Sequence, residues 1–236
     1  MVKLSIKGRV FIVSFAVGAL SFGMARVSFA QLTADDCSLA FQGSIKARKD
    51  VKLRTANDGA AYALVDNGKP ITVARWLEVA CDLNSQIQPD FKIPTSEPIP
   101  NIETKKVTIQ GYLLAAKFEG SKTGDRDIHA EISDTNIWRS KHMIIEVPPG
   151  NEYCSPRKKL WQMITDDPAK MKSGGKILDT PVKVTVTGYV FLDAAHGADC
   201  VSDGGRGMLK DGKGDQSQVV GLYEIHPVLD ISRTDN

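Results

Sequence analysis

The chain has 236 residues, of which 30 are Lys or Arg and 28 are Asp or Glu, so its formal net charge is +2. Four of the basic residues and none of the acidic ones lie in residues 1–30. The remaining chain therefore carries 26 basic and 28 acidic side chains, a net charge of −2. Proteins that bind DNA or RNA through phosphates usually carry a basic excess. The composition argues against a nucleic-acid partner and leaves other partners unknown.

The first thirty residues are typical of a secretory signal peptide. A basic start with Lys3 and Lys7 precedes an apolar stretch at residues 10–25, and Ser28-Phe-Ala30 places small residues before a cleavage position. This apolar stretch is short for a membrane-spanning helix, and no later stretch is long enough. We expect cleavage before Gln31, a periplasmic or secreted protein, and no stable membrane span afterwards.

Residues 31–87 are expected to form a small α/β unit at the N-terminus. The pattern predicts a short strand at residues 61–65 and a helix at 73–83, with Thr72 as its N-cap. Residues 88–105 contain four prolines, which is typical of an extended linker. A second domain is expected over residues 106–236.

The second domain shows the alternation of β-strands. Its predicted strands are residues 107–118, 127–133, 142–147, 182–192 and 221–231. A helix that begins at Pro156 separates the third strand from the fourth. This order, β-β-β-α-β-β, favours a five-stranded barrel like the OB fold. Gly111 and Gly188 are placed where curved strands need a bend. The alternative is a flatter α+β sheet; either way, the chain is expected to be mainly β with an α+β N-terminal part.

Four cysteines are present: Cys37, Cys81, Cys154 and Cys200. An even number in an exported chain indicates two disulfides, and four cysteines allow three pairings. We expect Cys37–Cys81 and Cys154–Cys200, one bond in each segment. Each would close a loop of about 45 residues and stabilise the fold by about 4 kcal/mol. The sequence has no C-x-x-C, so a thioredoxin-like redox site is not expected.

Four segments of the second domain combine acidic residues with histidine: DRDIHAEISD, HMIIEVPPGNEYC, VTVTGYVFLDAAHG and LYEIHPVLDI. They resemble a family of exported bacterial OB-fold-like domains for which no biochemical activity is established. Its pattern is D-x-H, E-x-P, G-x4-D-x2-H-G and E-I-H-P-V. The resemblance covers residues 106–231 and implies the barrel and the export, but no reaction. The chain departs from the family pattern by a long insertion between His196 and Glu224.

Six residues are candidates for a binding site: His129, Glu146, Asp193, His196, Glu224 and His226. Alternation along strands puts Asp127 and His129 on one face, and Glu224 and His226 on one face of the last strand. Imidazole and carboxylate groups are ligands for zinc or manganese, so a divalent metal is one interpretation. The same groups also satisfy one another in buried structural networks. They also perform general acid–base chemistry.

We favour a non-catalytic interpretation, because G-x-S-x-G and H-E-x-x-H are absent and no catalytic residue is assigned. The predicted function is an exported OB-fold-like binding or interaction module whose ligand is unknown. The alternative is a metal-dependent hydrolase or nuclease-like enzyme that uses the His/Glu/Asp set. The glycine-rich loop at residues 197–218 is expected to be flexible, with a contact to ligand left open.

Overall fold

The computed structural model describes residues 37–43, 48–55, 62–64, 69–87, 90–119, 125–164, 175–194, 218–219 and 222–234. The chain divides into two units, Met1–Gln31 and Leu32–Asn236, and every described residue lies in the second. The predicted signal peptide lies outside the described residues. Among the residues that are described, no helix is long and apolar enough to cross a membrane.

The fold is mainly β with a few helices, as predicted. In chain order the elements are α1 (Lys49–Lys52), β1 (Tyr62–Leu64), β2 (Ile71–Thr72), α2 (Val73–Ser85), β3 (Lys105–Phe118), β4 (Ile128–Ser133), β5 (Lys141–Val147), the 3-10 turn η2 (Asn151–Tyr153), α3 (Cys154–Ile164), β6 (Lys176–Leu192), β7 (Gln218–Val219) and β8 (Tyr223–Arg233). The five long strands and the helices α2 and α3 lie where the pattern predicted them. The short elements α1, β2 and β7 were not predicted.

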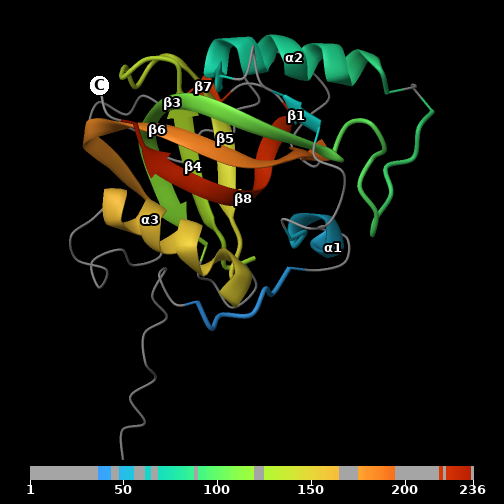
Figure 1. Ribbon diagram of the computed structural model, residues 1–236, viewed down its shortest axis with the longest axis horizontal. Helices are drawn as coiled ribbons and strands as arrows, with labels where there is room; N and C mark the ends of the chain where they lie inside the picture. The colour runs from blue at the N-terminus through green and yellow to red at the C-terminus, as the bar shows by residue number, and fades with distance from the viewer. Residues whose placement is uncertain are drawn as a thin grey trace, which may run out of the picture. The chain divides into compact units, whose positions relative to one another are not determined.

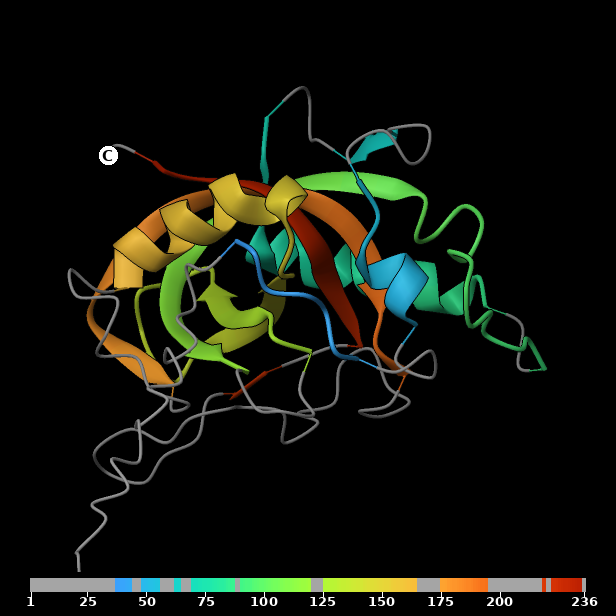
Figure 2. The same ribbon diagram turned by 90° about the horizontal axis from the view of Figure 1, so that it is seen from below.

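The long strands pair in a ring. β4 pairs with β3 and β5, β8 pairs with β5 and β6, and β6 pairs with β3. Figure 2 shows these strands curving around a common interior. The ring is uneven. β3 pairs with β6 from Lys106 to Ala116, with one register shift between Leu113 and Ala115, whereas β5 and β8 meet in register at Ile145 and Ile225.

A glycine permits the close approach of β6 and β8 in this ring. The β6–β8 register shifts on both sides of Gly188. A Cβ atom at Gly188 would collide with the Ile225 side chain and with the carbonyl oxygen of Pro227. Only a residue without a side chain lets the two strands approach so closely. The register shift and the close approach at Gly188 agree with the expected irregularity of this strand.

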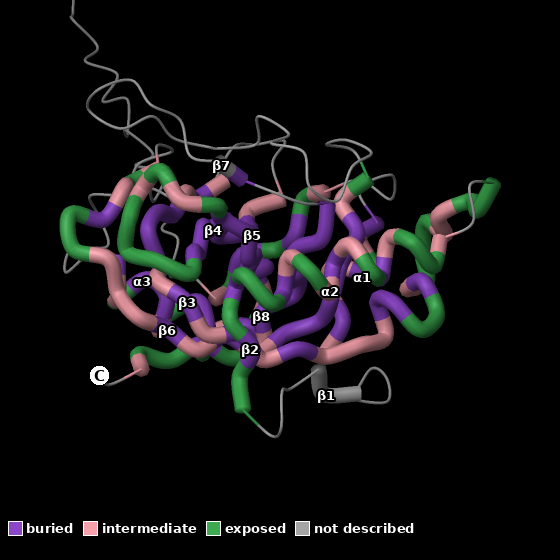
Figure 3. Tube along the Cα trace, turned by 90° about the horizontal axis from the view of Figure 1, so that it is seen from above, coloured by how far each residue is buried: buried purple, intermediate pink, exposed green. Residues whose placement is uncertain are grey.

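The core fills the interior of the ring and extends under α2. Alternate residues of each strand face inward, for example Met143, Ile145 and Val147 of β5, and Figure 3 shows the buried residues running along the strands. Trp76 of α2 and Ile99 of the proline-containing segment belong to the same core. Residues before, within and after the predicted linker thus share one hydrophobic core.

The helix α2 begins as its sequence predicted. The Thr72 hydroxyl accepts a hydrogen bond from the Arg75 N–H at 3.2 Å, which satisfies one free backbone donor of the first turn. The buried residues Trp76, Ala80 and Leu83 form a stripe along one face of the helix. Figure 1 shows α2 lying across the strands, away from α3.

The short helix α1 is anchored by a buried ion pair. Arg48 and Glu103 form two parallel hydrogen bonds of 2.6 Å. The Glu103 side chain is fully buried and also accepts hydrogen bonds from the N–H groups of Ile99 and Leu192. Arg48 in turn donates to the carbonyl oxygen of Pro94. The pair therefore joins α1 to the proline-containing segment and to the end of β6.

The predicted disulfide pairing is wrong. Cys37 is bonded to Cys154 at the start of α3, with 5.0 Å between their Cα atoms. Cys154 therefore cannot bond to Cys200, which lies outside the described residues. Cys81 on α2 is also disulfide-bonded. The prediction assumed that each segment folds alone, but residues 37–43 belong to the same compact unit as α3. Loop length is a weak guide to pairing, because doubling it costs only about 0.6 kcal/mol.

Disulfide mapping tests the bond. Proteolysis of the unreduced protein followed by mass spectrometry should yield a peptide pair that joins Cys37 to Cys154. The double variant Cys37→Ser/Cys154→Ser should lose about 4–5 kcal/mol of unfolding free energy, because the bond closes a loop of more than a hundred residues. A Cys37–Cys81 peptide pair would contradict the structure.

Replacement of Arg48 by Met tests the buried ion pair. We expect the free energy of unfolding to fall by about 3–5 kcal/mol, because Glu103 keeps a buried charge without its partner. The control is Lys159→Met, which breaks the ion pair of Lys159 with Asp230 on the surface. That pair is half exposed, so its loss should cost less than about 1 kcal/mol in urea unfolding. Equal effects of the two variants would contradict a structural role for Arg48.

Candidate functional site

The strands β4 and β5 carry polar residues on the face that points away from the core. Ala130 and Ile132 of β4 face the core, so His129 lies on the opposite face, and Glu146 pairs with it in register on β5. The His129 Nδ1 atom lies 2.9 Å from Glu146 Oε1. A carboxylate and an imidazole on neighbouring strands thus meet directly.

The last strand adds a second histidine to the same carboxylate. The Nδ1 atom of His226 on β8 forms an ion-pair contact with Glu146 Oε2. His226 is fully buried, and its ring lies 5.4 Å from the Phe191 ring of β6, measured between centroids. Each oxygen of Glu146 therefore faces one imidazole.

The helix α1 covers this polar face and supplies a cation. Lys52 Nζ lies 2.8 Å from Asp125 Oδ2 and 3.7 Å from Glu146 Oε2, and its side chain is 13% exposed. Burial alone would lower the Lys52 pKa, but the charges of Glu146, Asp127 and Asp125 raise it well above its ordinary value. Lys52 therefore stays protonated and balances part of the negative charge beneath it.

Asp127 completes the cluster and has a buried oxygen atom without a hydrogen-bond partner. It is 1% exposed, and its Oδ1 atom has no hydrogen-bond partner among the described residues. Asp127, Glu146 and His226 each offer one potential metal-ligand atom, and these three atoms lie within 4.8 Å of one another. We call Asp127, His129, Glu146 and His226, together with Lys52, the polar cluster.

The environment moves the pKa values of the polar cluster in different directions. Burial alone would raise the Glu146 pKa, but Lys52, His226 and the hydrogen bonds from both histidines hold it well below its ordinary value. Burial and the Glu146 charge raise the Asp127 pKa well above its ordinary value, although Lys52 opposes them. Burial lowers the His226 pKa against the attraction of Glu146. Glu146 is thus the charged centre, and Asp127 and His226 are driven toward their neutral forms.

The structure brings together three of the six predicted site residues: His129, Glu146 and His226. Glu224 lies on the same strand as His226, is buried, and contributes to the raised pKa of Lys52. Asp193 follows β6, and its N–H donates to the carbonyl oxygen of Leu222 at 2.9 Å. His196 lies outside the described residues, as does most of the loop at 197–218.

Sequence reasoning missed two groups of the polar cluster. Asp127 was placed on the face of His129 by strand alternation but was left out of the site, although it is the acid of the D-x-H pattern. Lys52 lies outside the four segments that combine acidic residues with histidine. Its position depends on the long-range contacts of Arg48. No local pattern could have found it.

A second carboxylate–imidazole pair lies on the same two strands. His142 Nδ1 lies 2.8 Å from Glu131 Oε2, and both side chains are fully buried. The Trp138 ring packs against the His142 ring edge-on, at 5.2 Å between centroids. With no exposed atom, this pair is suited to hold the β4–β5 hairpin together.

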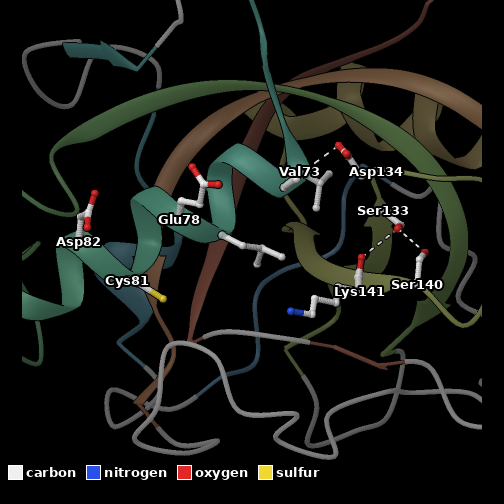
Figure 4. Close-up of a pocket in the computed structure, with 10 residues that line it drawn as sticks. Val73, Glu78, Cys81, Asp82, Ser133, Asp134, Ser140 and Lys141 are labelled. Atoms are coloured by element: carbon white, nitrogen blue, oxygen red, sulfur yellow. Dashed lines mark hydrogen bonds between the residues drawn. The ribbon is translucent and has the colours of Figure 1, made fainter.

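A groove of about 570 Å³ lies between α2 and the turn that joins β4 to β5. Figure 4 shows the helix on one side of it and the turn on the other, where the Ser133 hydroxyl bonds to Ser140 and to the carbonyl oxygen of Lys141. The volume is within the range of small-molecule sites, roughly 300–1,000 Å³. The lining residues are Val73, Ala74, Leu77, Glu78, Cys81, Asp82, Ser133, Asp134, Ser140 and Lys141.

Comparison of the chain with protein-family models, with curated proteins and with solved structures gives no match. The chemistry of the polar cluster and of the groove is therefore the basis for a functional proposal.

Two variants of equal shape test the polar cluster. Asp127→Asn should become more stable relative to the wild type as the pH rises above about 4, by up to about 1.4 kcal/mol per pH unit. The reason is that a raised pKa in the folded state penalises an acid that ionises freely when unfolded. Glu146→Gln should lose about 3 kcal/mol at neutral pH, because Lys52 and the histidines lose their charged partner.

Urea unfolding between pH 4.5 and 8 in buffer with EDTA measures both effects. The stability that ionised Glu146 provides is complete above its ordinary pKa of about 4 and is lost as the pH falls through its lower folded-state pKa. If both variants gained or both lost unfolding free energy at neutral pH, the assignment of Glu146 as the charged centre would be contradicted.

Proposed function

We propose that the chain is an exported binding module, built on an OB-fold-type barrel, that takes a small ligand in the groove between α2 and the β4–β5 turn. The strand order supports the barrel. The first long strand, β3, pairs with the second and the fourth, and the fifth, β8, lies between the third and the fourth. The helix α3 connects the third strand to the fourth. An OB fold has this arrangement.

Export is supported by the signal-like first thirty residues together with the disulfide chemistry. Cys37 and Cys154 are bonded, and Cys81 is disulfide-bonded too. Disulfides of this structural kind persist in oxidising compartments and are rare in the cytosol.

The groove is favoured over the polar cluster as the ligand site because of exposure. OB folds bind ligands on the face of the second and third strands, here β4 and β5. The part of that face with Glu146 is covered by α1, which brings Lys52 within 3.7 Å of it. At the other end of the strands, Asp134 and Lys141 are exposed and border the groove.

The lining of the groove defines a class of ligand. Ala74 and Leu77 provide an apolar floor. The rim carries the ammonium group of Lys141 and the carboxylates of Asp82, Asp134 and Glu78, of which Glu78 is paired with Arg75 at 2.6 Å. A small molecule with an apolar body and a cationic group complements this surface, because the body removes apolar area from water and the cation meets an acidic rim. The groove, with its apolar floor and acidic rim, is the observation that carries the proposal.

The convergence of His129, Glu146 and His226 favours a second candidate, a metal-dependent hydrolase or nuclease-like enzyme. We place it second because His226 is fully buried and Asp127 is 1% exposed. A substrate would reach these groups only after α1 had moved away. The groove requires no such movement.

The fluorescent cation dansylcadaverine tests the groove, with the anion 1-anilinonaphthalene-8-sulfonate as its counterpart. We expect saturable binding of the cation, weaker binding of the anion, and a higher melting temperature with the cation present. Leu77→Ser should weaken binding of the cation at least roughly tenfold, because it removes apolar floor. The matched control is Ile137→Ser, which deletes an apolar side chain that is 60% exposed and does not line the groove. Equal affinity in all three proteins would rule out the groove as the ligand site.

A further inference from the structure

Three ligand-type side chains from distant parts of the sequence meet in the polar cluster. Asp127 precedes β4, Glu146 lies near the end of β5, and His226 lies on β8. One potential ligand atom from each lies within 4.8 Å of the other two, and all three residues are buried. The fold holds them in place through strand pairing, as rigid metal sites require.

The Lys52 ammonium is the positive group that both carboxyl groups of this triad share, and its hydrogen bond goes to Asp125. The Nδ1 atoms of His129 and His226 face the oxygens of Glu146. Asp127 Oδ1 is buried and receives no hydrogen bond from the described residues. Two buried carboxyl groups so close together repel each other when ionised, unless a proton or a cation lies between them. A cation bound between the two carboxyl groups would give Asp127 Oδ1 the direct partner that it lacks among the described residues.

The neighbouring groups His129, Lys52 and Asp125 are placed where they can orient the ligands or exchange with a bound cation. His129 hydrogen-bonds to Glu146 and fixes its orientation, as residues behind metal-binding carboxylates do. Lys52 is held by Asp125 at 2.8 Å and lies farther, at 3.7 Å, from Glu146. Lys52 can therefore remain hydrogen-bonded to Asp125 when another cation binds to Glu146.

We propose that Asp127, Glu146 and His226 bind one divalent transition-metal ion, and that the Lys52 ammonium competes with this ion for Glu146. Two carboxylates and one imidazole suit zinc or manganese. The imidazole makes the set a poor match for calcium, which takes oxygen ligands. The side chains of Lys52 and Asp125 beside the triad are 13% and 19% exposed, so the ion enters beside these two residues. The site is separate from the groove and does not depend on a ligand there.

The test uses the mature chain after removal of metals with EDTA and dialysis. Calorimetric titration with zinc chloride and with manganese chloride, followed by elemental analysis, should show uptake of one equivalent of at least one of these ions. Asp127→Asn should bind at least roughly tenfold more weakly, because a ligand is lost. Lys52→Met keeps all three ligands and removes a positive charge, so it should bind at least roughly tenfold more tightly.

The Lys52 variant separates a specific site from adventitious binding. Asp230→Asn removes an exposed carboxylate outside the polar cluster and should leave uptake unchanged. Uptake that Asp127→Asn and Lys52→Met both leave unchanged would place the ion elsewhere and overturn the proposal. Absence of stoichiometric uptake in the wild type and in Lys52→Met would overturn it as well. If Asp127→Asn fails to fold, the metal affinity of Lys52→Met tests the proposal by itself: tighter binding than in the wild type supports it, and unchanged binding overturns it.

Discussion

The bidentate pair of Arg48 and Glu103 is the interaction on which the arrangement of the N-terminal residues depends. It lies in the interior, and Glu103 is also satisfied by backbone N–H groups from two other segments. Such a pair tolerates little displacement, because a shift of either partner leaves a buried charge unsatisfied. α1 has only four residues and would not be stable alone. The ion pair, rather than helix propensity, holds α1 against the strands.

The position of α1 determines what the polar face of the strands can do. With α1 in place, Lys52 closes over Glu146, and the cations Arg48 and Lys52 both lie over the ring of Phe191, at 5.2 and 5.5 Å from its centroid. Water is largely excluded, so each remaining charge interacts more strongly with its neighbours than it would at the surface. The same cover that stabilises the cluster also makes it a poor place for a large substrate.

The sequence predicted the parts of this structure that depend on local patterns. Strand alternation located β3 to β6 and β8, Thr72 marked the start of α2, and Gly188 marked an irregularity in the pairing of β6 with β8. Alternation also placed the histidines of β4 and β8 on polar faces, although it could not show that both would meet one carboxylate. The disulfide partner of Cys37 and the position of Lys52 depend on contacts across the whole chain. Periodicity carries no information about such contacts.

Strands β4 and β5 form part of both the polar cluster and the groove. The N-terminal residues cover one and border the other, so they are an integral part of the fold. At one end of the pair, α1 buries Glu146; at the other, α2 borders the groove beside Ser133 and Lys141. Both covers come from residues before β3, and both are tied to the core, α1 through Arg48 and α2 through Trp76. A change in the charge balance under α1 would act on the same hairpin that forms a wall of the groove. Any ligand function at the groove therefore requires the N-terminal residues as much as the strands.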